Sequence, residues 1–287
     1  MDQTARFDPR KGGMSLVELV IVIVILGILS TVLGLIIAGP IRGFFETGRR
    51  VALVEDASTA LTQMVRDIRA ALPNSVRTTQ SGGVTALELI ETLDGARYRD
   101  GPGGGVTAAA DILTFNAPSS GFNILGHFEN LTLPLTTSTD DLVIYNTGQT
   151  GANAYDITAG PPNVITPAGT TISITAGTEE DHVSISPAFQ FKYPSPYERV
   201  YLVSGPVSWF CDPGAGTLRR ESGYAISATE PVSASAGNLA TDQVSACSFT
   251  YTPGTAERAG LVTLSLTLSS HQESVTLLRE VQVVNAP

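Results

Sequence analysis

The sequence has few of the residues that most often build catalytic or metal centres. Its 287 residues include two cysteines and three histidines, and the histidines lie far apart, at His127, His182 and His271. No HExxH zinc motif and no GxSxG nucleophile elbow occur. The glycine-rich stretch 101–105 lacks the Lys-Ser/Thr pair of a phosphate-binding loop. These absences argue against an enzyme and against a zinc site.

Basic residues are scarce beyond residue 77. Residues 78–287 hold eight Lys/Arg and twenty Asp/Glu, whereas residues 1–77 hold nine and seven. Such an acidic C-terminal part offers no basic patch to neutralise phosphates, so we expect it to bind no nucleic acid. The composition suits a soluble domain outside the cytoplasm.

One long apolar run lies near the N-terminus. Residues 19–41 contain no charged side chain, and as an α-helix they would extend about 34 Å, enough to cross a hydrocarbon core of about 30 Å. Residues 1–13 form a polar leader whose Arg6, Arg10 and Lys11 place it in the cytoplasm by the positive-inside rule. An ordinary secretory signal peptide would have a shorter apolar region.

Glu18 lies at the edge of this run, where an unpaired carboxylate is costly in lipid. Cleavage between Gly13 and Met14 would explain it, because the freed α-amino group of Met14 could neutralise Glu18 of a neighbouring subunit. The stretch resembles the type IV prepilin signal, with Gly13 as the cleavage residue and Glu18 as the fifth residue of the mature chain. The resemblance implies cleavage by a prepilin peptidase and N-methylation of Met14. The alternative is an uncleaved signal anchor.

The helical pattern continues beyond the apolar run. Gly39-Pro40 is expected to bend or locally open the helix, because Pro40 has no backbone N–H to donate. Pro73 is expected to end it after Leu72. Residues 14–41 are therefore predicted as a transmembrane and assembly helix, and residues 42–72 as an amphipathic helix. Its apolar stripe comprises Val54, Ala57, Leu61, Met64, Val65, Ile68 and Leu72, with Asp67 and Arg69 mostly off the stripe.

Residues 73–287 are predicted as a β-rich extracytoplasmic head, which makes the fold class α+β and pilin-like. Strands are expected at 86–91, 111–115, 141–145, 182–186, 199–203, 207–211, 217–221, 247–251, 261–268 and 274–284. Residues 118–121 and most of 136–167 are expected to be loops. Residues 213–216 should connect one hairpin, and the last two strands should form another, with Val262, Leu264, Leu266 and Leu268 on one face.

Cys211 and Cys247 are 36 residues apart and, outside the cytoplasm, are predicted to form a disulfide; two free buried thiols are the alternative. Two acidic groups, 179–181 and 140–141, could offer oxygens to calcium. Neither has the spacing of an EF-hand loop. Solvated loops are the preferred interpretation of both, and no cofactor is expected.

Residues 66–77, 200–224 and 281–287 resemble minor pilins of the MSHA biogenesis MshO type. The resemblance implies a minor pilin that initiates, caps or decorates an MSHA-type pilus. Its expected partners are other major and minor pilins, the prepilin peptidase and the inner-membrane assembly platform. It also implies an inner-membrane protein with a periplasmic head before assembly. The alternatives are a minor pseudopilin of type II secretion or a membrane-anchored ligand-binding or adhesive head.

Overall fold

The computed structural model describes residues 14–103, 108, 111–233, 237–255 and 258–283. Within them lie one α-helix and thirteen β-strands. The chain divides between Val51 and Ala52 into two compact units, which are described separately. A long N-terminal helix and a β-rich head with antiparallel sheets are both present, so the α+β prediction is confirmed.

Helix α1 runs from Leu16 to Arg69 over 54 residues. It continues through Gly39-Pro40, so the expected local opening at this site is wrong. Pro40 removes one backbone donor, and the residues on both sides keep their helical conformation.

The last turns of α1 pack on the head through one apolar stripe. Its buried members are Leu53, Ala57, Ala60, Leu61, Met64 and Ile68. Val54 is 38% exposed, so its predicted place on the stripe is wrong, and the stripe instead begins at Leu53. The helix ends at Arg69 rather than at Leu72. Strand-like pairing begins before Pro73, because the Leu72 N–H donates to the Ile90 carbonyl at 2.8 Å.

Two long antiparallel strands form the centre of the head, β2 (Val84–Arg97) and β8 (Arg199–Asp212). They belong to a six-stranded sheet in the order β1-β2-β8-β9-β10, with β5 also paired to β8. The other members are β1 (Arg77–Ser81), β5 (Asp141–Val143), β9 (Thr217–Ser222) and β10 (Asn238–Thr241). Residues 199–203 and 207–211 were expected to be separate strands, which is wrong. The chain stays extended between them, and a register shift at Gly205, with φ +111°, absorbs the irregularity.

Two smaller antiparallel sheets complete the head. One contains β11 (Val244–Thr252), β12 (Gly260–Ser270) and β13 (Glu273–Val283) in that order. The other has the order β3-β7-β6-β4, formed by β3 (Ser119–Asn123), β4 (Leu135–Thr137), β6 (Thr171–Thr175) and β7 (His182–Phe189). Both predicted hairpins are confirmed, β8–β9 and β12–β13. The four predicted inward residues of β12 are fully buried.

Two strand predictions fail in the 111–123 region. Residues 111–115 are not a strand, and Ser119–Asn123 is a strand where a loop was expected. Four further strands, β1, β4, β6 and β10, were not predicted. They are three to five residues long. Such short segments carry too little periodicity to be recognised, because their place in a sheet depends on a partner strand.

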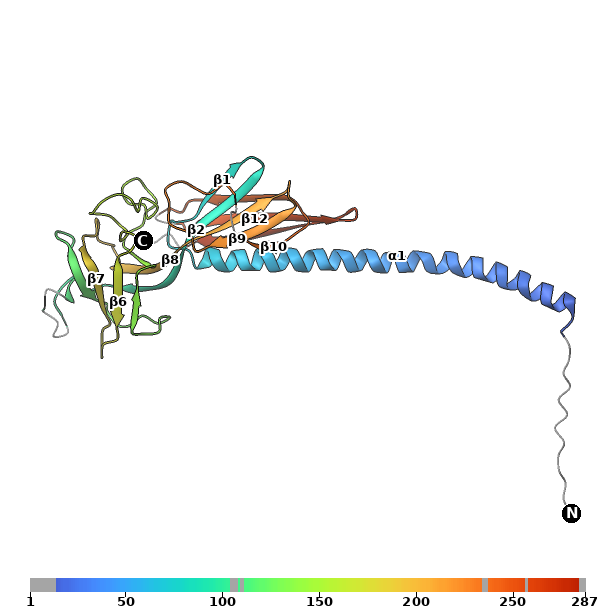
Figure 1. Ribbon diagram of the computed structural model, residues 1–287, viewed down its shortest axis with the longest axis horizontal. Helices are drawn as coiled ribbons and strands as arrows, with labels where there is room; N and C mark the ends of the chain where they lie inside the picture. The colour runs from blue at the N-terminus through green and yellow to red at the C-terminus, as the bar shows by residue number, and fades with distance from the viewer. Residues whose placement is uncertain (1–13, 104–107, 109–110, 234–236, 256–257, 284–287) are drawn as a thin grey trace, which may run out of the picture. The chain divides into compact units, whose positions relative to one another are not determined.

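The buried residues form two large clusters joined by a small one. The first gathers α1, the β11–β13 sheet and Trp209. The second lies among β3, β6, β7 and the far ends of β2 and β8, and the third, around Leu72 and Tyr155, lies between them. Figure 1 shows β6 and β7 in one lobe of the head and β9, β10 and β12 in the other. The long β2–β8 pair therefore belongs to both lobes.

Candidate functional site: the N-terminal helix and its contacts with the head

The start of α1 holds the residues of the predicted processing site. Met14 lies two residues before the first residue of the helix and is 63% exposed, and Glu18 lies in the first helical turn. A carboxylate there is favoured by the positive end of the helix dipole. Gly13 and the rest of the leader lie outside the described residues. The geometry therefore places the candidate amine and carboxylate on the same helix end.

Among the described residues of its own unit, none covers the apolar half of α1. Its large apolar side chains between Leu16 and Ile41 are 42–78% exposed on every face. Among the described residues, α1 is the one helix long and apolar enough to span a membrane. A helix that is apolar all round needs lipid or other helices to cover it.

The comparisons with known proteins agree with this arrangement. A family model described as the prokaryotic N-terminal methylation motif matches residues 8–34. The match covers residues 8–13 of the leader, Met14, Glu18 and residues 19–34 of the apolar run. The chain is type IV prepilin-like. The motif indicates a pilin- or pseudopilin-like protein that is processed by prepilin peptidase. No curated protein and no solved structure gives a significant match to the chain.

Prepilin-like proteins of this kind are typically structural and not enzymatic. The motif and the apolar helix together suggest anchoring in the inner membrane before assembly into a pilus. Along the chain, the second half of the same helix joins the head to this anchor. The contacts between this half of the helix and the head therefore connect the head to the membrane segment.

Asp67 is the polar residue through which the helix binds the head. Its side chain is buried, although the sequence placed it mostly off the apolar stripe, so that prediction is wrong. The carboxylate accepts hydrogen bonds from Trp209 Nε1 at 2.8 Å and from Arg220 Nε at 2.7 Å. Trp209 lies on β8 and Arg220 on β9. The hydrogen bond from Trp209 and the ion pair with Arg220 thus join α1 to two strands of the central sheet.

The position of Asp67 in the sequence does indicate its burial, although the apolar periodicity alone does not. It follows Met64 by three residues and directly precedes Ile68, and both neighbours are buried. Residues three and four apart share a helix face, so Asp67 lies at the border of the stripe. A carboxylate at such a border is expected to seek a donor from the packed surface.

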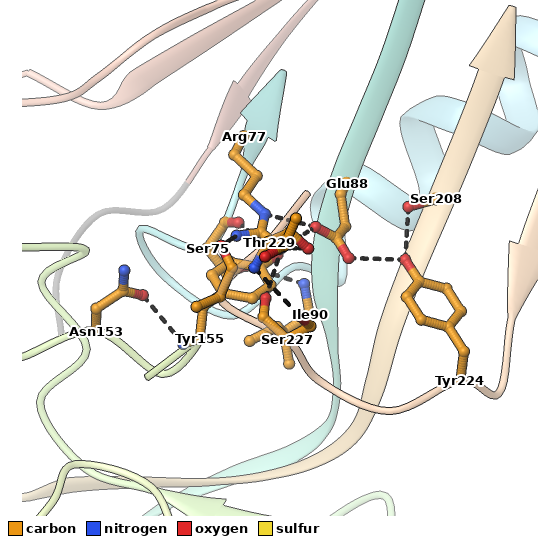
Figure 2. A network of polar contacts seen from close by, with 11 residues as sticks. Ser75, Arg77, Glu88, Ile90, Asn153, Tyr155, Ser208, Tyr224, Ser227 and Thr229 are labelled. Atoms are coloured by element: carbon orange, nitrogen blue, oxygen red, sulfur yellow. Dashed lines mark hydrogen bonds and ion pairs between the residues drawn. The ribbon is translucent and has the colours of Figure 1, made fainter. Parts of the chain in front are cut away.

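A second polar network holds the strands next to the end of the helix, and Figure 2 shows Arg77 and Tyr224 pointing toward Glu88. Arg77 on β1 pairs with Glu88 on β2, and the Tyr224 hydroxyl donates to the other carboxylate oxygen at 2.8 Å. Ser208 and Tyr224 lie 2.6 Å apart between their oxygens. Burial raises the pKa of Glu88, and the hydrogen bonds from Arg77 and Tyr224 only partly offset this.

Arg77 connects this network to two loops. Its guanidinium donates to the carbonyls of Ser227 and Ala228, at 2.8 and 3.0 Å. It also lies 3.5 Å from the centre of the Tyr155 ring, and the Tyr155 hydroxyl donates to the Ser75 carbonyl at 2.9 Å (Figure 2). Burial raises the pKa of Tyr155 well above its ordinary value. These groups are occupied by one another, which indicates a structural clamp and not a reactive centre.

The acidic groups considered for calcium are engaged by the protein. Asp181 is fully buried, so the expectation of a solvated loop is wrong for this residue. Burial raises its pKa, but hydrogen bonds from His127 and from the Phe128 and Gly177 backbone outweigh this and hold the pKa below its usual value. Glu180 pairs with Arg99, and that hydrogen bond lowers the Glu180 pKa.

The second acidic group is also occupied by local donors. Asp140 accepts from the Thr137 hydroxyl at 2.7 Å, and Asp141 accepts from the Thr166 hydroxyl at 3.1 Å. Burial raises the pKa of Asp141 to about 6. The described residues contain no group of three or more His, Cys, Asp or Glu side chains that could hold a metal.

Cys211 and Cys247 form a disulfide in the structure, and the described residues include no free cysteine. The bond joins β8 to β11 and therefore links the central sheet to the three-stranded sheet. Trp209, two residues before Cys211, is fully buried in the same cluster.

Proposed function

We propose that the chain is a minor pilin of a type IV pilus of the MSHA type. It is cleaved after Gly13, N-methylated at Met14 and held in the inner membrane with a periplasmic head. It then enters a helical bundle with other pilins and initiates, caps or decorates the fibre. We assign residues 1–13 to the leader, 14–41 to the membrane and assembly helix, 42–72 to its amphipathic continuation and 73–287 to the head.

The observation that supports this proposal is the contrast between the two halves of α1. The first half is apolar and exposed on all faces, and the second half buries a single stripe. Lipid and a bundle of similar helices can each cover such a helix, so it can pass from the membrane into a fibre without exposing its apolar faces to water. Glu18 is the one charged residue at its start, and a methylated amine of an adjacent subunit is the group that would neutralise it.

Mass spectrometry of the protein from cells that contain the prepilin peptidase tests the processing step. The expected N-terminal peptide begins at Met14 and carries one methyl group. A protein that retains residues 1–13 in those cells contradicts the proposal.

Incorporation into fibres tests the role of Glu18. Glu18→Ala should leave membrane insertion intact and reduce the amount of the protein in sheared pili. Glu18→Gln keeps the shape of the side chain and removes its charge, so it tests the charge alone. Glu46→Ala is the matched control, since Glu46 is an exposed carboxylate on the same helix. Equal incorporation of the Glu18 and Glu46 variants contradicts the charge-pairing role.

The pseudopilin alternative is tested by the identity of the assembly. Deletion of the gene should change piliation or pilus-dependent adhesion and leave type II secretion unaffected. A secretion defect with normal pili would assign the chain to a pseudopilus instead.

A further inference from the structure

A recess lies on the head next to the end of α1. Its volume is about 310 Å³, and its wall includes Arg69, Thr92, Leu93, Asn130, Arg199 and Tyr201. A second hollow of about 220 Å³ shares Arg199 and Tyr201 with it. This volume is in the lower part of the range for small-ligand sites. The recess is used by neither the assembly helix nor the Arg77 clamp.

A β-bulge shapes the wall of the recess. Thr92 lies opposite Val203 and Asp94 opposite Leu202, so Leu93 is an extra residue in β2. Bulges redirect side chains and are often found beside functional sites. Leu93 is 37% exposed. The Thr92 Oγ1 atom is buried and has no hydrogen-bond partner among the described residues. This oxygen is closed off from the recess, so the wall that a ligand would meet here is formed by Leu93 and not by the Thr92 hydroxyl.

Two guanidinium groups give the recess a local positive charge. Among the described residues, neither Arg69 nor Arg199 lies within ion-pair distance of a carboxylate. Arg97, which lines the smaller hollow, is already paired with Glu198. Two arginines on the wall of one recess in an acidic head favour a ligand that brings its own carboxylate.

One carboxylate also lies in the wall, and its hydrogen-bonding capacity is already used. Asp94 accepts from the Gly95 backbone N–H at 2.8 Å, from the Asn130 backbone N–H at 2.7 Å and from the Asn130 side-chain amide at 3.1 Å. Its negative charge reduces the attraction for an anion, so we expect weak, millimolar binding. The same hydrogen bonds hold Asn130 at the rim.

Tyr201 provides an aromatic surface between the two hollows. A Cβ atom built on Gly95 would lie 2.8 Å from Tyr201 Cδ1, so the ring rests against the bare backbone of this glycine. Only glycine permits this close approach. A ring beside amide and guanidinium groups suits a sugar, whose C–H groups contact the ring and whose oxygens accept hydrogen bonds.

We propose that this recess binds a uronic acid unit of an acidic polysaccharide. Arg69 and Arg199 hold the carboxylate, and Tyr201 and Leu93 contact the sugar ring. The head then has a binding function in addition to assembly. An acidic peptide offers the same carboxylate but has no ring of C–H groups to lie against Tyr201.

Saturation-transfer NMR on the full mature chain in detergent micelles tests the proposal, with trigalacturonate, neutral galactose and the dipeptide Glu-Glu as probes. Trigalacturonate should receive saturation and the other two should not. Arg199→Gln and Arg69→Gln should each weaken trigalacturonate binding about tenfold or more, the expected effect of losing a charged hydrogen bond. Arg279→Gln is the control, because Arg279 is exposed on β13 and outside the recess.

Trp209 fluorescence confirms folding of each variant. Equal binding of trigalacturonate by the Arg199 and Arg279 variants overturns the proposal, and so does equal binding of galactose. Tighter binding of Glu-Glu than of trigalacturonate overturns the assignment to a sugar.

Discussion

Replacement of Asp67 by alanine should break the connection between α1 and the central sheet. The variant loses the hydrogen bonds from Trp209 Nε1 and Arg220 Nε, at 2.8 and 2.7 Å. Removal of one partner of a buried ion pair costs about 3–5 kcal/mol, because the remaining charge is left without a partner. A buried indole N–H without an acceptor costs about 1–3 kcal/mol, and part of this is contained in the first value. We therefore expect a destabilisation of about 3–5 kcal/mol.

Intrinsic fluorescence is well suited to this measurement, because Trp209 is the one tryptophan of the chain and lies in the interface. Urea unfolding of the mature protein in detergent micelles gives the free energy from the midpoint and the slope. Far-UV circular dichroism should give the same transition and excludes a purely local change at the indole.

Two further variants separate the contributions. Asp67→Asn keeps an oxygen acceptor but loses the charge, so it should cost about 1–3 kcal/mol. Asp56→Ala removes an exposed carboxylate from the same helix and should change stability by less than about 0.5 kcal/mol. A loss for Asp67→Ala within about 1 kcal/mol of this control would refute the reasoning, as would a strong salt dependence, since buried pairs are little screened.

Three other predictions concern the head. Burial raises the Asp141 pKa to about 6, so ionisation of Asp141 destabilises the fold as the pH rises from about 4 to 6. Asp141→Asn should therefore be more stable than the parent by about 2–3 kcal/mol at pH 8. The same stability difference between variant and parent at pH 4 would contradict this. Cys211 and Cys247 are 36 residues apart, and their joint replacement by serine should lower the free energy of unfolding in urea by about 3–4 kcal/mol relative to the disulfide-bonded protein. The double variant should be as stable as the unsubstituted protein after its disulfide has been reduced. Leu266→Ala should cost about 2–5 kcal/mol in a fully buried site, against less than about 0.5 kcal/mol for the exposed Leu278→Ala control.

The sequence was most informative where one physical requirement acts over many residues. An uncharged run of membrane length, an amphipathic continuation and an alternating β12 each repeat their signal along the chain, and all three are present. The Cys211–Cys247 pair was predictable because two cysteines allow one pairing. The processing residues Gly13 and Met14 and the assembly role of Glu18 remain predictions.

The parts that could not be predicted depend on contacts between distant segments. Arg77 meets Glu88 within a hairpin, but it also meets Ser227 and Tyr155, which lie far away in the sequence. The burial of Asp181 likewise depends on donors from residues 127 and 128. No periodicity reports such contacts. A polar residue in a loop has the same local pattern whether water or a folded partner surrounds it.

The two halves of α1 lead to opposite expectations for fibre assembly and head stability. Glu18 belongs to the unit before Ala52, and Asp67 belongs to the unit after it. Glu18→Ala should therefore reduce incorporation into fibres and leave the Trp209 unfolding transition unchanged. Asp67→Ala should shift that transition and leave N-terminal processing at Met14 intact. If the Glu18 variant also destabilised the head, the helix would transmit its membrane environment to the fold, and assembly and stability could not be separated in this protein.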